Sequence, residues 1–270
     1  MTPITVSAIT IYPVKSTAGI STDKAGVVPE GLSFDRRWAV ADTDNQVITA
    51  REYPRLLAIH TVITGDTLRI MIPGFPDITV PLQPVHMNLI PVNIFGTVVH
   101  GNQLNETADA YVSAFLGIPC RLVFQDEGCE RLMKPVYGGR ITDTVSYADS
   151  APIMLVSSHT LEELNGKLPE PVSMQRFRPN IVVTGCGPDE EDDWKMIQIG
   201  ELIFDVNEKC KRCVMTTIDP ATGERKKNQE PLRTLATYKP HIRGGVSFGV
   251  TLIPRSSGFI STGDPVTVLK

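Results

Sequence analysis

Segments of alternating apolar and polar residues, rich in Val, Ile and Thr, recur along most of this chain and favour strands over helices. Residues 4–14 alternate in this way, and residues 36–50 have the pattern strand, turn, strand. Residues 60–74 have the pattern of a hairpin with Gly65 and Asp66 at its tip. Further strands are expected in residues 89–101, 179–185, 196–206, 246–254 and 264–270. The sequence therefore predicts a mainly β (α+β) fold.

Two segments have the spacing of a helix instead. Residues 105–117 carry an apolar stripe on one face, and Gly117 followed by Pro119 ends the pattern. The stripe consists of Ala108, Tyr111, Val112 and Phe115. Residues 157–168 fit a second helix that begins with a Ser or Thr cap. We expect short helices at these two places within a chain of strands.

The charge balance and the cysteine count exclude several classes of protein. The chain has 26 Lys and Arg against 30 Asp and Glu, a net charge of −4, which argues against a nucleic-acid binder. It contains no apolar run near the ~20 residues of a membrane helix, and its first residues lack the pattern of a secretory signal. Five cysteines are an odd number, so we expect a reducing, cytoplasmic setting rather than a disulfide framework.

Cys210 and Cys213 form a CxxC pair within residues 209–223, and four interpretations of this pair stay open. A structural zinc site needs four ligands, and the other three cysteines have no CxxC partner. A redox pair should open a helix, whereas the residues that follow are typical of a strand and a turn. A single reactive thiolate is the third possibility, since neighbouring cations lower a thiol pKa. These cations are Lys209, Lys211 and Arg212. The fourth is that both cysteines are small core residues at a strand end.

Cationic side chains stand next to polar ones at several places along the chain. Lys15 and Ser16 follow the first strand, and Arg36 and Arg37 are expected on opposite faces of a strand. Arg178 stands between Phe177 and a proline, in a half-buried setting where a guanidinium group needs a fixed anion. Cations next to hydroxyl groups can form a phosphate-binding site.

Other polar clusters are less specific. Asp149 and Ser150 lie in "YADSAP", and Asn180 follows Arg178 in "FRPN". The acidic run at 189–194 has no second acidic cluster at metal-binding spacing, so we expect a solvated loop there.

Taken together, the motifs resemble those of a known family. The segment "RCVMTTIDPATG…EPLRTL" (212–235) is similar to the signature of the MOSC domain, which binds molybdenum cofactor. "IYPVKS", "GLSFDRRW" and "TAREYPRL" resemble the β-rich domain that precedes it in one branch, and "FRPNIVVTGC" and "GDPVTVL" match further along. That branch contains the mitochondrial amidoxime-reducing component and bacterial reductases of hydroxylamino bases. The resemblance implies a β-rich N-terminal domain followed by a MOSC β-barrel with short helices. We place the boundary near residue 122, after the first predicted helix, which gives domains at 1–122 and 123–270.

The resemblance also assigns roles to residues. It implies that the thiolate of Cys213 binds molybdenum and is the catalytic residue, whereas Cys210 is not a metal ligand. Soft sulfur ligands suit molybdenum, in agreement with this assignment. The positions that match those holding the pterin or its phosphate are Lys15, Ser16, Arg36, Asp149, Ser150, Arg178, Asn180 and Arg212.

The function implied by the resemblance is reduction of N-hydroxylated compounds, such as hydroxylamino purines, amidoximes and hydroxamic acids, to amines or amidines. The alternative is a carrier or binding protein for molybdenum cofactor or sulfur. No cysteine follows Cys213, so we expect no iron–sulfur cluster within this chain. We expect a separate electron-donor protein, a flavoprotein or an iron–sulfur protein, and no nucleic-acid or membrane partner.

Overall fold

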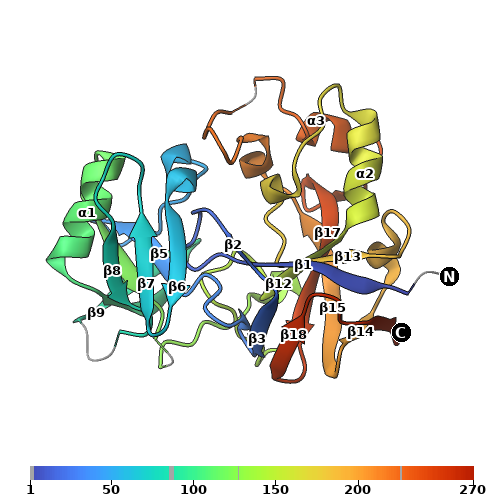
Figure 1. The fold of residues 1–270 in the computed structure, drawn as a ribbon, viewed down its shortest axis with the longest axis horizontal. Helices are drawn as coiled ribbons and strands as arrows, with labels where there is room; N and C mark the ends of the chain where they lie inside the picture. Colours follow the sequence, from blue (N-terminus) through green and yellow to red (C-terminus); the bar gives the residue numbers. More distant parts are fainter. Residues whose placement is uncertain (1–2, 85–87, 127, 226) are drawn as a thin grey trace.

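The computed structural model describes residues 3–84, 88–126, 128–225 and 227–270, which form two lobes (Figure 1). The larger lobe is built on a nine-stranded sheet. In spatial order its strands are β19 (Val266–Val268), β14 (Met196–Ile199), β15 (Leu202–Lys211), β17 (Gly245–Pro254), β12 (Ile153–Ser157), β13 (Ile181–Thr184), β1 (Thr5–Ile11) and β2 (Ile20–Thr22), with β16 (His241–Ile242) paired to β17. A three-stranded sheet of β18 (Gly258–Ser261), β3 (Lys24–Val28) and β4 (Gly31–Leu32) adjoins it.

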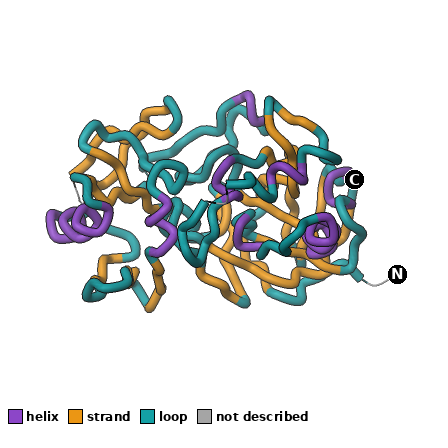
Figure 2. Tube along the Cα trace, turned by 90° about the horizontal axis from the view of Figure 1, so that it is seen from above, coloured by secondary structure: helices purple, strands orange, loops and turns teal. Residues whose placement is uncertain are grey.

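The smaller lobe has two further sheets. One consists of β5 (Trp38–Asp42), β11 (Cys120–Phe124), β10 (Thr97–Gln103) and β9 (Asn88–Ile94), and the other of β6 (His60–Thr64), β7 (Thr67–Met71) and β8 (Ile78–Pro81). The α-helices are α1 (Glu106–Leu116), α2 (Ser158–Lys167) and α3 (Leu232–Leu235). The 3-10 helices are η1 (Pro54–Ala58), η2 (Pro135–Tyr137), η3 (Met174–Arg176), η4 (Glu190–Asp193) and η5 (Val214–Thr217). Seen from above, α1 lies at one end of the molecule and α2 near the other (Figure 2). The predicted mainly β fold is confirmed.

Both predicted helices are present, with the end at Gly117 that the sequence predicts for the first and the serine cap that it predicts for the second. Asn105 accepts a hydrogen bond from the backbone N–H of Ala108 at 2.8 Å, and Gly117 ends α1 in the left-handed conformation with φ of 73°. Ser157 caps α2 by accepting a hydrogen bond from the N–H of His159. The local rules for helix ends therefore hold at both places.

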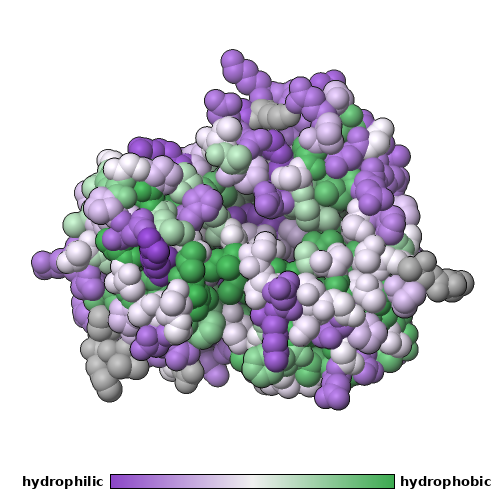
Figure 3. Space-filling view, in the orientation of Figure 1, coloured by the Kyte–Doolittle hydropathy of each residue, from purple (hydrophilic) through white to green (hydrophobic). Residues whose placement is uncertain are grey.

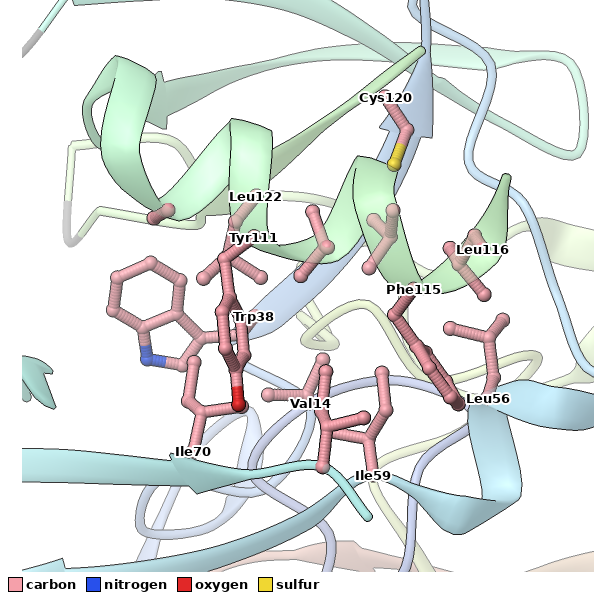
Figure 4. Packing of buried hydrophobic residues seen from close by; sticks show 14 of the residues in the cluster. Val14, Trp38, Leu56, Ile59, Ile70, Tyr111, Phe115, Leu116, Cys120 and Leu122 are labelled. Atoms are coloured by element: carbon pink, nitrogen blue, oxygen red, sulfur yellow. The ribbon is translucent and has the colours of Figure 1, made fainter. Parts of the chain in front are cut away.

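The apolar stripe of α1 forms the core of the smaller lobe. Tyr111 and Phe115 point from the helix toward Trp38, Leu56 and residues of the strands below (Figure 4). The aromatic side chains meet at angles, as in the tilted pair of Trp38 with Phe124, whose centroids are 4.8 Å apart. Trp38 and Leu56 are fully buried. This packing fixes the strand that follows the Arg36 turn.

Strand register in the larger sheet brings distant segments together. β1 and β13 are antiparallel, with Ile9 opposite Ile181, so the residues after β1 lie beside those before β13. β12 and β13 are parallel, with Leu155 opposite Ile181, so the residues before β12 lie there as well. The sheet also takes in the start of the chain, because β1 and β2 belong to the larger lobe. A domain boundary near residue 122, which falls within β11, stays a proposal.

Three local predictions from the sequence are wrong. Residues 33–36 form a turn, so Arg36 and Arg37 do not lie on a strand, and Arg36 has a positive φ of 50°. After β5, Gln46 and Val47 make only isolated bridges instead of a second strand. The residues after Cys213 form the 3-10 helix η5 rather than a strand. Each error falls where a turn replaces the extended backbone that β-branched residues favour.

The acidic run at 189–194, predicted as a solvated loop, is exposed only in part and forms the 3-10 helix η4. Glu191 is fully buried and accepts hydrogen bonds from the N–H of Ser157 at 3.0 Å and from Thr160 Oγ1 at 2.9 Å. Burial raises the pKa of Glu191. Asp192 forms an ion pair with Lys209 at 3.0 Å. Glu191 and Asp192 therefore brace α2 and β15, whereas Glu190 and Asp193 remain exposed to solvent.

The surface seen in Figure 3 is mixed. Hydrophobic residues gather where the two lobes meet, and hydrophilic residues cover most of the rest of this face (Figure 3). Within the described ranges, no helix has the length and apolar character needed to cross a membrane.

Candidate functional site

One pocket brings together every site residue that the sequence predicted. Its volume is about 140 Å³. The predicted residues among its walls are Lys15, Ser16, Arg36, Asp149, Ser150, Arg178, Asn180, Arg212 and Cys213. They come from the segments that follow β1 and β15 and from those that precede β5, β12 and β13.

Asp149 is the acidic residue among the described residues that line this pocket. Its carboxylate accepts hydrogen bonds from Lys15 and from Arg51, and both contacts are ion pairs. Burial alone would raise the pKa of Asp149, but the two cations outweigh it and hold that pKa well below its usual range. Lys15 Nζ also donates to the carbonyl oxygen of Tyr147 at 2.7 Å. Burial lowers the pKa of Lys15 to about 8, against the opposing attraction of Asp149.

Two guanidinium groups pack on the buried ring of Tyr12. The Cζ atoms of Arg36 and Arg178 are 4.3 and 4.1 Å from its centroid. Arg36 forms an ion pair with Asp35 and donates to Asn180 Oδ1 at 2.9 Å. Arg178 donates to the carbonyl oxygen of Thr17 at 2.6 Å but forms no ion pair with any described residue, and burial lowers its pKa to about 10. The pocket thus holds Arg178 as an uncompensated charge.

Arg212 is a second guanidinium group without a carboxylate among the described residues. It donates to the carbonyl oxygen of Phe177 at 2.6 Å and contacts Met154 Sδ at 2.9 Å and Cys210 Sγ at 3.1 Å. Burial raises the pKa of Cys210, although Arg212 opposes this effect. Cys210 therefore lies half-buried against Arg212, and its thiol form is favoured.

Cys213 has a different cationic neighbour from the one that the sequence indicated. Lys209 pairs with Asp192, Lys211 donates to a backbone carbonyl, and Arg212 contacts Cys210. In the described part of the chain, the cation in contact with Cys213 is Arg51, whose Nε donates to Sγ at 3.4 Å. The prediction that the adjacent Lys and Arg residues surround this thiol is wrong, because their side chains are engaged elsewhere.

The hydrogen-bond capacity of this pocket fits an anion. Nη2 of Arg178, Nε of Arg212 and Nη1 of Arg176 are buried and have no partner in the described structure. Unpaired buried donors on charged groups cost several kcal/mol unless a ligand binds them. Ser16 and Ser150 add hydroxyl groups to the same walls. A phosphate-bearing cofactor next to a free thiol matches this set of groups.

Sequence reasoning missed Arg51. It lies in "TAREYPRL", a motif that the resemblance includes but to which it assigned no role. Arg51 reaches the pocket from the smaller lobe and bridges Asp149 and Cys213, which no periodicity or spacing indicates. Arg37, by contrast, does not line this pocket. It lines a separate cavity of about 440 Å³ that contains none of the predicted site residues.

Metal and disulfide sites of the ordinary kinds are not found in the part of the chain that the structure describes. No three His, Cys, Asp or Glu side chains there lie close enough to hold a metal ion. All five cysteines are free.

Two domain families match this chain. Residues 3–119 match the MOSC N-terminal beta barrel domain, and residues 142–267 match the MOSC domain.

Full-length relatives match over nearly the whole chain. The mitochondrial amidoxime-reducing component 1 of mouse (Mus musculus) is 36% identical over 98% of this chain and 82% of the relative. The human (Homo sapiens) component 1 is 33% identical over 98% and 83%, and component 2 of cattle (Bos taurus) is 33% identical over 97% and 82%. The chain therefore belongs to the family of the mitochondrial amidoxime-reducing components, in which a MOSC N-terminal beta barrel domain precedes a MOSC domain.

Proposed function

We propose that this chain binds molybdenum cofactor in the pocket around Cys213 and reduces N-hydroxylated compounds to amines or amidines. The observation that carries the proposal is a surplus of buried, partly unpaired cationic groups in the same pocket as a half-buried thiol. The relatives named for amidoxime reduction support the choice of substrate class. Hydroxylamino purines, amidoximes and hydroxamic acids all belong to this class.

The residues that would hold the cofactor divide by chemistry. Arg178, Arg212 and Lys15 would bind its phosphate and other anionic groups, because charge-assisted hydrogen bonds to such groups are strong. Cys213 would supply the protein's thiolate to the metal, and Arg51 fixes the position of its sulfur. When bound, the cofactor supplies a metal centre that exchanges two electrons and an oxygen atom. The protein orients it and balances its charge.

The overall reaction determines how many electrons and protons must be supplied. Reduction of R–NHOH consumes two electrons and two protons and releases R–NH2 and water. The chain has no glycine-rich nucleotide fingerprint after a strand. We therefore propose that a separate donor protein, a flavoprotein or an iron–sulfur protein, delivers the electrons. Within the acidic run at 189–194, Glu190 and Asp193 stay exposed, whereas Glu191 and Asp192 are engaged within the fold.

The test is elemental analysis of freshly purified protein followed by an assay with a chemical reductant. About one molybdenum per chain and reduction of hydroxylaminopurine or benzamidoxime would support the proposal. Bound molybdenum without turnover would favour the alternative, a carrier of the cofactor. Absence of molybdenum after expression in a cofactor-producing host would contradict both.

Arg178→Ala is expected to lose far more molybdenum during purification than Arg37→Ala. Loss of a charge-assisted contact to the cofactor costs about 1.5–3 kcal/mol. Arg37 is a matched control because it donates to a backbone carbonyl, that of Gln125, and lines the other cavity. The measurement is molybdenum per chain, with thermal unfolding as a check on folding. Equal molybdenum content in the two variants would count against the pocket.

The affinity of cofactor-free protein for sulfate is expected to fall as the pH rises from 7 to 9. Lys15 has a pKa of about 8, so its ammonium group, which attracts the anion, is lost across this range. Sulfate keeps its charge there, and the loss of one charged contact corresponds to about tenfold in affinity. Titration calorimetry of the wild type and of Lys15→Met tests this. The same decline in Lys15→Met, or no decline in the wild type, would refute it.

Cys213→Ser is expected to abolish turnover, whereas Cys210→Ser keeps most of it. A serine hydroxyl is a hard, weakly acidic ligand and cannot replace a thiolate at molybdenum. Cys210 lies against Arg212 and serves as the control at the same end of β15. The rate with reduced methyl viologen measures the difference. Full turnover of Cys213→Ser would show that the ligand is wrongly assigned.

NADPH alone is expected to give no turnover with the purified chain, whereas a reduced viologen dye does. To use NADPH directly, a protein needs a site for the nucleotide and a bound carrier that accepts the hydride and passes on single electrons. The sequence has a motif for neither. The measurement is the consumption of NADPH by the purified chain in the presence of benzamidoxime, with no electron-transfer protein added. Steady consumption would reveal a second cofactor site.

A further inference from the structure

A strained phenylalanine stands at the tip of the β9–β10 hairpin. Phe95 and Gly96 form its two-residue turn, with φ of 50° and 79°. Such a turn favours asparagine or glycine at its first position, and a bulky side chain there is strained. Asn93 Oδ1 accepts a hydrogen bond from the Gly96 N–H at 2.9 Å, so the turn closes without the ring. The phenyl group must therefore serve another purpose than the turn.

The ring of Phe95 lies beside two cations, Lys15 of the pocket wall and Arg51. Its centroid is 5.1 Å from Lys15 Nζ and 5.1 Å from Arg51 Cζ. Both cations bind Asp149, and Arg51 also contacts Cys213. The carbonyl oxygen of Phe95 accepts a hydrogen bond from Lys134, which ties the hairpin tip to the segment before η2. The smaller lobe thus places an aromatic ring next to the cations that adjoin Cys213.

The other two rings that contact the pocket cations are covered. Phe177 is fully buried and stacks on Phe248 with centroids 3.9 Å apart, and Tyr12 is 3% exposed beneath Arg36 and Arg178. Phe95, in contrast, is 44% exposed. An exposed ring beside a reactive site offers a surface on which a flat molecule can stack.

We propose that Phe95 is a specificity-determining residue that stacks on the aromatic part of the substrate. This inference rests on the proposed function, because it concerns the substrates of the same site. Aromatic N-hydroxylated compounds have a flat ring that can stack on Phe95 while the N–O group points toward Cys213. Small aliphatic ones, such as acetamidoxime, have no ring and gain nothing from Phe95.

Steady-state kinetics of the cofactor-loaded protein with benzamidoxime and acetamidoxime test this. Phe95→Ala is expected to lower kcat/KM for benzamidoxime about five- to tenfold, and to change that for acetamidoxime less than twofold. Phe95→Trp should keep the preference for the aromatic substrate. Val98→Ala is the matched control, since Val98 is 64% exposed on the same hairpin. Saturation-transfer NMR should show weaker binding of benzamidoxime to Phe95→Ala, independently of turnover.

The outcomes separate this inference from the proposed function. A wild type that reduces neither substrate contradicts the proposed function itself. A wild type that reduces both, with an unchanged substrate ratio in Phe95→Ala, overturns only the role of Phe95. An equal loss for both substrates would show that Phe95 merely supports Arg51, and would overturn the specificity role as well. Molybdenum content and thermal unfolding of each variant exclude loss of cofactor or of the fold as the cause.

Discussion

Buried positive charge without enough carboxylate to balance it is the constraint around which the pocket is built. Arg178 and Arg212 are held by backbone carbonyl oxygens and aromatic rings, and each keeps a buried N–H without a partner in the described structure. Taking such groups out of water costs several kcal/mol each unless an anion compensates them. The strand register gathers these groups in one pocket, because it brings the segments before β12 and β13 beside the end of β1. A bound anionic cofactor would turn this cost into binding energy.

Backbone strain gathers at the same positions. Ser16, Arg36 and Arg178 have φ of 68°, 50° and 54°, in the region that glycine prefers. Strained residues persist where the surrounding structure holds them firmly and are common at binding sites. The strands next to them supply that support, as with Trp38, buried directly after the Arg36 turn. The pocket is therefore held in its shape before any ligand arrives.

Asp149 couples the two lobes. It binds Lys15, which follows β1 of the larger lobe, and Arg51, which comes from the smaller lobe. Arg51 in turn contacts Cys213, and Phe95 covers both cations from the hairpin tip. One carboxylate thus orients a cationic side chain from each lobe. This arrangement explains why the smaller lobe matters to a site whose residues come mostly from the larger one.

The sequence predicted what depends on local rules. The end of α1 at Gly117 and the hairpin at Gly65 follow from neighbours a few residues away, and both are present. The residues of the pocket were predicted from their resemblance to family motifs, and not from the periodicity or spacing of the sequence. Arg51 was missed and Glu191 was placed in solvent because their surroundings are set by residues far along the chain. The cations beside Cys213 were misjudged for the same reason.

We propose that the thiolate of Cys213 binds the metal of a cofactor held by the cations of the pocket. Molybdenum K-edge X-ray absorption of the purified protein tests this directly, because it counts the sulfur atoms bound to the metal. The claim predicts that Cys213→Ser loaded with cofactor has one sulfur ligand fewer than the wild type, while Cys210→Ser has the same number. An unchanged sulfur count in Cys213→Ser would contradict it.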